Sequence, residues 1–197
     1  MNSITGIIGD PGRSEAPRVI KWLTRSKLAA PVWTAMRVWL GIMWIEAGVS
    51  KLWGAENPGF LHNNGAAVAG FAGHAVASYS WWASFLHSFV VPNAGWIGVL
   101  VAVAEFLAGI GLALGLFTPA AALGALILNV VYMLSGTAGV NPFYAVFAVV
   151  ILATWRTSGW IGADGLILGY IQRRRDQRRL IHRRQDAVGL VEHPQAA

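Results

Sequence analysis

The stretch VWTAMRVWLGIMWIEAGVSKLW, residues Val32–Trp53, decides the fold class. It is long and apolar enough to cross a bilayer, because a membrane-spanning helix needs about 20 residues. It nevertheless carries Arg37, Glu46 and Lys51. A charged group at the centre of a membrane costs about 2.5–3.5 kcal/mol, and it is retained where it finds a partner or lines a polar cavity. The stretch therefore predicts an integral membrane bundle whose helices turn these side chains inward.

The composition of the whole chain agrees with a membrane protein. Of its 197 residues, 55% are hydrophobic and 12% are charged, and soluble proteins carry about 25% charged residues. Five of the 15 Lys and Arg residues precede residue 30 and eight follow residue 155, so that Arg37 and Lys51 alone lie between. Basic ends around a nearly uncharged middle predict that both termini are cytoplasmic. Because the basic residues adjoin apolar spans, we expect the bilayer as their partner and no nucleic acid.

The chain contains no cysteine. This excludes CxxC redox chemistry, iron–sulfur clusters held by thiolates and c-type haem attachment. The predicted spans contain no histidine, which excludes a b-type haem between two intramembrane histidines. His62, His74 and His87 are spaced too widely for a recognisable metal motif. We therefore expect no metal, haem or iron–sulfur cluster, and a redox role would need an organic cofactor or a partner protein.

We predict an all-α, four-helix integral membrane bundle in the plasma membrane, with cytoplasmic N and C termini. Its spans are residues 32–53, 93–117, 119–135 and 142–156, within a membrane domain at 32–157. A basic cytoplasmic tail precedes this domain at 1–31 and another follows it at 158–197. The first 30 residues lack the apolar core of a cleavable signal peptide, so we expect the first span to direct its own insertion.

The segment 54–92 contains no Lys or Arg, which predicts an external location. Apolar residues at 82, 85, 86, 89 and 90 follow a helical period. We predict two short interfacial helices that cover the outer mouth of the bundle, with a re-entrant loop as the alternative. In the tails, residues 18–27 are typical of a short helix on the inner leaflet or of a disordered basic tail. The Arg-rich segment after Asp164 predicts a surface helix that ends near Gly189.

Two acidic residues are the candidate catalytic groups. Helix rise places Glu105 near the midplane and Glu46 in the outer half of the membrane. A carboxyl at the midplane must pair with a base, be protonated or face a hydrated cavity. Lys51 has a simpler explanation, because its side chain can reach the outer surface.

The candidate cofactor-binding residues are Arg37, Asn129 and Tyr132. Asn129 lies near the depth of Glu105, with Tyr132 one turn further along the third span. Each has a structural alternative: Arg37 can bind backbone carbonyls or reach the inner leaflet, and Asn129 can join helices by hydrogen bonds. Gly111 and Gly115 form a GxxxG pair that predicts a close helix contact.

Four segments together resemble one protein family. They are RVWLGIMWIEAGVSKLW from Arg37, YSWWASFLHSFVVPNAGWIG from Tyr79, AEFLAGIGLALGLFTP with Glu105, and SGWIGADGLI with Asp164. In this order they resemble the DoxX family of membrane proteins, over about residues 33–166. The resemblance implies the membrane subunit of a quinone-linked oxidoreductase, related to thiosulfate:quinone oxidoreductase, with a quinone as cofactor and a soluble redox partner.

A quinone site needs an apolar slot with proton-carrying groups at its head, for which Glu46, Glu105, Asn129 and Tyr132 are the candidates. The sequence has no flavin or metal motif that would carry electrons to a quinone, so it leaves open whether the chain is a complete enzyme. One alternative is a non-catalytic anchor or assembly factor that recruits a soluble redox protein. Another is a small proton-coupled transporter built around Glu46 and Glu105. The sequence is also compatible with a homo-oligomer.

Overall fold

The computed structural model describes residues 26, 28–77, 79–137 and 139–192, with the backbone alone beyond residue 180. Every regular element in these residues is a helix, and they contain no strand. The all-α prediction is therefore confirmed. The segment predicted at residues 18–27 lies almost wholly outside the described residues.

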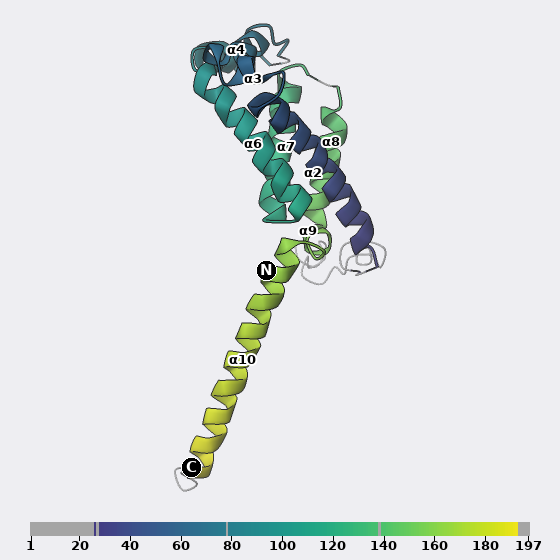
Figure 1. Ribbon diagram of the computed structural model, residues 1–197, viewed down its shortest axis with the longest axis vertical. Coiled ribbons are helices and arrows are strands. Elements are labelled where there is room, and N and C mark those ends of the chain that lie inside the picture. The colour runs from purple at the N-terminus through teal and green to yellow at the C-terminus, as the bar shows by residue number, and fades with distance from the viewer. Residues whose placement is uncertain (1–25, 27, 78, 138, 193–197) are drawn as a thin grey trace, which may run out of the picture.

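Four long helices form the bundle: α2 (Ala30–Leu52), α6 (Ala94–Leu114), α7 (Thr118–Leu134) and α8 (Asn141–Ala153). Successive helices run in opposite directions, and all four lie side by side (Figure 1). α2 packs mainly on α6, α8 packs on α7, and α6 also contacts α7. The helix ends fall within three residues of the predicted spans. Proline in the first turn of α2, α7 and α8 helps to set where these helices begin.

Among the described residues, α6 is the one helix that is long and apolar enough, by length and composition, to cross a membrane. α2 has 23 residues but carries three charged side chains. The apolar helices α7 and α8 are shorter, with 17 and 13 residues. Crossing of the membrane by α2, α7 and α8 therefore stays a prediction.

The bundle places small and polar residues inside and large apolar residues outside. Its buried core cluster contains four alanines with Leu40, Trp44, Leu112 and Ile151, all from the four long helices. The largest fully buried polar side chains are Arg37, Glu105 and Asn129. The outward faces carry large exposed apolar residues, among them Trp39, Ile42, Val49, Leu100, Leu107, Leu123, Ile127, Val146 and Val149. This distribution is typical of helices that contact one another through small residues and face lipid through large ones.

Glycines allow the close approach of α2 and α6. A Cβ added to Gly41 would lie 2.5 Å from the Ala113 nitrogen, and one added to Gly109 would lie 2.5 Å from the Ile45 nitrogen. Gly48 faces the backbone of Phe106 in the same way. None of these three glycines belongs to the predicted GxxxG pair, Gly111 and Gly115, yet they make the close contact between α2 and α6.

Of that pair, Gly111 does lie at a helix contact. A Cβ on Gly111 would lie 2.8 Å from the Ala121 Cβ on α7. Gly115 instead ends α6 with a φ of +66°, the left-handed conformation that glycine favours at a helix C-terminus.

Two glycine substitutions should have opposite effects on stability. Gly109→Ala should lower the free energy of unfolding by about 1–3 kcal/mol, because the new methyl group forces apart the backbones of α2 and α6. Gly124→Ala on α7 should be neutral or raise it by up to about 1 kcal/mol, because a Cβ there meets nothing within 4 Å and alanine favours the helix. Unfolding of both variants in detergent with increasing sodium dodecyl sulfate measures the difference. Equal effects would contradict the close α2–α6 contact.

Short helices cover one end of the bundle (Figure 1). They are α3 (Asn57–Phe60), the 3₁₀ turn η2 (Asn63–Gly65), α4 (Ala66–Gly73), α5 (Ser80–Phe85) and the π-helix η3 (Leu86–Val90). The segment is thus more divided than the two helices that we predicted. Left-handed backbone at Asn64 and Gly65, with φ values of +52° and +69°, separates α3 from α4.

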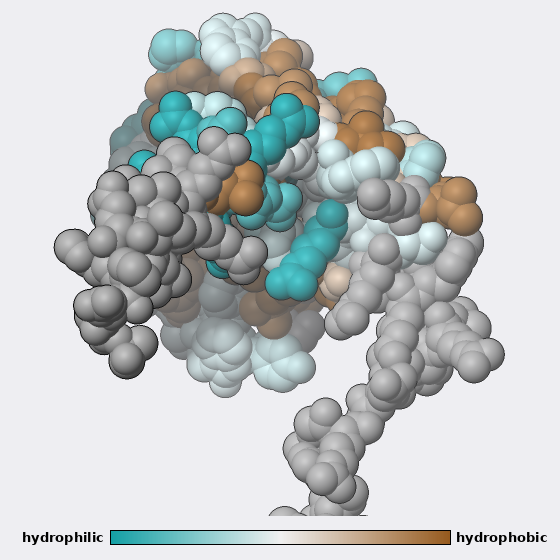
Figure 2. All heavy atoms as spheres, turned by 90° about the horizontal axis from the view of Figure 1, so that it is seen from below, coloured by the Kyte–Doolittle hydropathy of each residue, from teal (hydrophilic) through white to brown (hydrophobic). Residues whose placement is uncertain are grey.

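At the opposite end, the turn α9 (Trp155–Ser158) leads into α10 (Ala163–Glu192). Asp164 lies in the first turn of α10, where a carboxylate is favourable. α10 extends away from the bundle (Figure 1) and continues past Gly189, where we predicted the end of the surface helix. Figure 2 views the molecule from this end, where hydrophilic residues gather toward the middle and hydrophobic residues occupy much of the rim.

Candidate functional site

A cavity of about 750 Å³ lies at the end of the bundle that the short helices cover. This is within the range of about 300–1,000 Å³ that small-molecule sites occupy. Its walls are almost entirely apolar and come mainly from α2, α4, α5, η3, α6 and α7, with further residues from α3 and α8. They include Met43, Val68, Phe71, Phe85, Leu86, Phe89, Ile97, Leu100, Val101 and Val131. The cavity therefore suits an apolar molecule.

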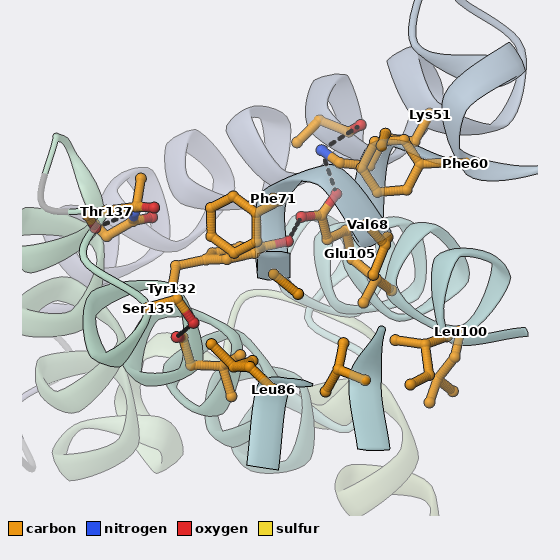
Figure 3. Close-up of a pocket in the computed structure, with 18 of the residues that line it drawn as sticks. Lys51, Phe60, Val68, Phe71, Leu86, Leu100, Glu105, Tyr132, Ser135 and Thr137 are labelled. Atoms are coloured by element: carbon orange, nitrogen blue, oxygen red, sulfur yellow. Dashed lines mark hydrogen bonds and ion pairs between the residues drawn. The ribbon is translucent and has the colours of Figure 1, made fainter. Parts of the chain in front are cut away.

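Three polar side chains meet at the head of this cavity (Figure 3). Lys51 Nζ lies 2.9 Å from Glu105 Oε2, and the Tyr132 hydroxyl donates a hydrogen bond to Glu105 Oε1. The side chain of Glu105 is 2% exposed and that of Lys51 is 13% exposed. Glu105 thus holds an ammonium and a phenol, one on each carboxylate oxygen, against an otherwise apolar space. We refer to Lys51, Glu105 and Tyr132 as the polar head.

Lys51 links the polar head to the exposed end of the molecule. Its Nζ also lies 3.6 Å from Oε2 of Glu56, a side chain that is 51% exposed. The ammonium sits 5.2 Å from the centre of the Phe60 ring, where the ring face attracts a cation. Ser50 holds Glu56 through a hydrogen bond of 3.2 Å. Lys51 is therefore fixed between a buried and an exposed carboxylate.

Aromatic and hydroxyl groups complete the surroundings of the polar head. The rings of Phe71 and Tyr132 meet edge to face with 6.2 Å between their centres, an arrangement that fixes the phenol. One turn further along α7, Ser135 accepts a hydrogen bond of 3.0 Å from Trp82 Nε1. Tyr132 and Ser135 both line the cavity, so the last turn of α7 and its C-cap each contribute one hydroxyl group to the lining.

The structure brings together two of the five predicted site residues. Glu105 and Tyr132 share the polar head. Glu46 lies on the exposed face of α2 and does not line the cavity, so the acidic pair of Glu46 and Glu105 does not form. Helix geometry explains this, because Glu46 is two residues from the buried Trp44 and thus points to the other side of α2. Asn129 is buried between helices outside the cavity lining, and its Nδ2 donates to the Ala125 carbonyl.

Arg37 lies at the opposite end of the bundle from the polar head, with only 1% of its surface exposed. Its guanidinium donates hydrogen bonds to the carbonyls of Ser158 at 3.0 Å, Ile161 at 2.9 Å, Ala113 at 3.3 Å and Leu112. The structure thus places Arg37 as a link between α2, the end of α6 and the turn before α10. This is the backbone-binding alternative that the sequence left open, and Arg37 does not line the cavity.

Sequence reasoning missed the part that Lys51 plays. Arg37 and Lys51 are the only Lys or Arg residues from 28 to 155, and a buried carboxylate requires a base or a proton. Since Arg37 lies in the inner part of its helix, Lys51 was the one available partner for Glu105. The pairing of Lys51 with Glu105 was not predicted, because the reach of Lys51 to the outer surface already explained its charge.

Comparison with known proteins gives one match. Residues 32–138, more than half of the chain, match the DoxX family. The matched region includes α2, the short helices, α6 and α7, and therefore the whole polar head. The segment around Asp164, which also resembles the family, lies outside the match. Neither the comparison with curated proteins nor that with solved structures gave a match.

Proposed function

Because the chain belongs to the DoxX family, we propose that it is the membrane subunit of a quinone-linked oxidoreductase and that its cavity binds the quinone. Thiosulfate is the first electron donor to test. The observation that carries this proposal is the polar head of Lys51, Glu105 and Tyr132 in an apolar cavity of about 750 Å³.

In this proposal the protein lies in the plasma membrane, α2, α6, α7 and α8 cross it, and both ends of the chain are in the cytoplasm. Large apolar side chains on the outward faces support this placement. The start of α2 and the turn after α8 lie at the same end, since Arg37 bonds to Ser158. The exposed arginines of α10 also lie at this end, as expected for the cytoplasmic side.

The cavity residues fit a quinone in size and in chemistry. A quinone has two carbonyl acceptors on a flat apolar ring, and when bound it supplies the capacity to take up two electrons and two protons. Lys51 Nζ is the donor for one carbonyl, because its ammonium keeps further N–H groups beside the one that faces Glu105, and Phe60 and Phe71 are rings at the polar head. Glu105 orients Lys51, accepts the one hydroxyl proton of Tyr132 and supplies carboxylate oxygens that can hold a proton.

The same arrangement gives protons a route to water. Glu56 is exposed and adjoins Lys51, which adjoins Glu105. The rest of the cavity lining is almost entirely apolar, so this line of polar groups is the proposed route for proton exchange. Electrons are expected to come from a soluble redox partner, because the chain has no cysteine for thiol or iron–sulfur chemistry.

The first experiment identifies what the protein carries. The chain is purified in mild detergent, and its extracted lipids and bound proteins are identified by mass spectrometry and optical spectra. We expect about one quinone for each chain, and this result would justify an assay of thiosulfate-dependent quinone reduction. A quinone-free protein that also fails to bind added quinone would contradict the proposal.

A second candidate function is a non-catalytic anchor that recruits a soluble redox protein. It is favoured by α10, which projects from the bundle and carries five exposed arginines within seven residues: Arg173, Arg174, Arg175, Arg178 and Arg179. Arginines on such a projecting helix suit an acidic protein surface.

Truncation separates the two candidates. Removing residues 172–197 should abolish co-purification of an acidic redox partner, because the exposed arginines are lost. Quinone binding should stay unchanged, because the cavity lies at the other end of the bundle. Pull-down followed by quinone titration of the same sample measures both effects. A bound partner with no quinone in any sample would leave the anchor as the function.

A further inference from the structure

One wall of the cavity comes from a single short stretch of chain, α5 and η3. Five of its side chains line the cavity: Trp82, Phe85, Leu86, Phe89 and Val90. The two helices pack on each other, and η3 packs on α4, but they have few contacts with the long helices. By contrast, α2 and α6 pack closely through their glycines. This wall, which we call the α5–η3 wall, is thus attached more loosely than the walls that the long helices form.

The two ends of the α5–η3 wall are held differently. At its C-terminal end the chain continues through Pro92 into α6, and the rings of Phe89 and Trp96 meet with 6.2 Å between centres. Toward its N-terminal end, Trp82 Nε1 donates a hydrogen bond of 3.0 Å to Ser135 Oγ on α7. Within the part of the chain that the structure describes, this is the hydrogen bond that joins the wall to α7. The wall is therefore joined directly to α6 through Pro92 and to α4 through residues 74–79, whereas one side-chain hydrogen bond joins it to α7.

The outer side of the α5–η3 wall is apolar. Trp81, which does not line the cavity, is 60% exposed, and the lining residues Phe85 and Phe89 are themselves 39% and 43% exposed. Exposed aromatic side chains are typical of the boundary between membrane and water. The wall also contains a π-helix, in which the Val91 amide bonds to the Leu86 carbonyl. Such turns are rare and are frequent at functional sites.

We propose that α5 and η3 form a lateral gate of the cavity, closed by the Trp82–Ser135 hydrogen bond, through which an apolar ligand passes between the bilayer and the cavity. When this bond breaks, the wall moves away from α7 about its tether at Pro92 and opens the cavity beside Tyr132. That the ligand is a quinone rests on the proposed function, whereas the gate rests on the attachment of the wall.

A single cysteine reports on the gate, because the chain has none of its own. Val68→Cys places a thiol on α4 in the cavity lining (Figure 3). The protein is reconstituted in liposomes, and the thiol is labelled with N-phenylmaleimide, which dissolves in the bilayer. Ala72→Cys, another buried lining position on α4, supplies a second reporter.

Two variants remove the bond that closes the gate. Trp82→Phe keeps an aromatic ring and removes the N–H donor, and Ser135→Ala removes the acceptor. Each should raise the labelling rate about three- to tenfold, the population change expected from the loss of one hydrogen bond. The double variant should label no faster than the faster single variant, because both changes remove the same bond. Ser88→Ala is the matched control, since its hydroxyl bonds to the Ser84 carbonyl within the wall, and its rate should not change.

Two results would overturn the gate. One is an unchanged rate in both Trp82→Phe and Ser135→Ala. The other is an equal rate increase for a charged, water-soluble thiosulfonate, which would mean that the cavity opens to water and not to the bilayer. Because no quinone is used, a chain that shows the expected rates but binds no quinone supports the gate and contradicts the proposed function alone.

Discussion

Arg37→Met should lower the free energy of unfolding by about 3–5 kcal/mol, the range seen when one partner of a buried charged interaction is lost. Methionine fills much of the same space but donates no hydrogen bond. The carbonyls of Leu112, Ala113, Ser158 and Ile161 would then lose a donor, and the bonds to Leu112 and Ser158 are buried. Unfolding in mixed detergent micelles, followed by circular dichroism, measures the loss.

Arg156→Met is the matched control for this change. Arg156 is exposed and lies over the ring of Trp155, so its replacement should change the free energy of unfolding by less than about 0.5 kcal/mol. Arg37→Lys should fall between the two, because an ammonium cannot reach in several directions as the planar guanidinium does. Equal losses in Arg37→Met and Arg156→Met would show that the buried hydrogen bonds of Arg37 do not contribute to the free energy of unfolding.

Glu105→Gln should weaken quinone binding about 10- to 100-fold, which corresponds to the loss of one or two charge-assisted hydrogen bonds at the polar head. Glutamine has nearly the same shape, but it has no charge to hold Lys51 and only one oxygen to accept from Tyr132. The Lys51 ammonium, the donor at the polar head, would then no longer be held in place by a carboxylate. Titration with a short-chain quinone in nanodiscs, followed by quenching of tryptophan fluorescence, measures the affinity.

Glu46→Gln makes the same chemical change on the same bundle, away from the cavity. Because Glu46 is exposed and does not line the cavity, its replacement should leave the affinity within about twofold. Tyr132→Phe should weaken binding less than Glu105→Gln does, since it removes the hydrogen bond to Glu105 while Lys51 and Glu105 remain paired. If both glutamine variants bound quinone as tightly as the unchanged protein, the polar head would have no part in quinone binding.

The sequence was sufficient for the helices and named two members of the polar head, Glu105 and Tyr132. Runs of apolar residues bounded by Pro92, Pro119 and Pro142 give helix ends close to those observed, because proline and the apolar period act locally. Glu105 was identified for a similar reason, since a carboxyl in the middle of an apolar helix always needs an explanation. The family resemblance was confirmed over the region that contains these helices.

The grouping of side chains could not be obtained in the same way. Glu46 and Lys51 lie on one helix, five residues apart, and both carry charge, yet one faces outward and the other pairs with Glu105. The rotation of α2 about its own axis decides between them. That rotation follows from the contacts of Gly41 and Gly48 with α6, which the sequence of α2 alone does not reveal.

By itself, then, the sequence determined the helical class, the approximate ends of the four long helices and the presence of charge where a membrane protein rarely keeps it. These are properties of single segments and of their solvation. Only the tertiary structure decided that Lys51 and Tyr132 flank Glu105, that Arg37 ties backbone carbonyls together at the other end, and that α5 and η3 wall a cavity. The physical reason is that such contacts join residues distant in the chain, and helix packing sets which of them meet.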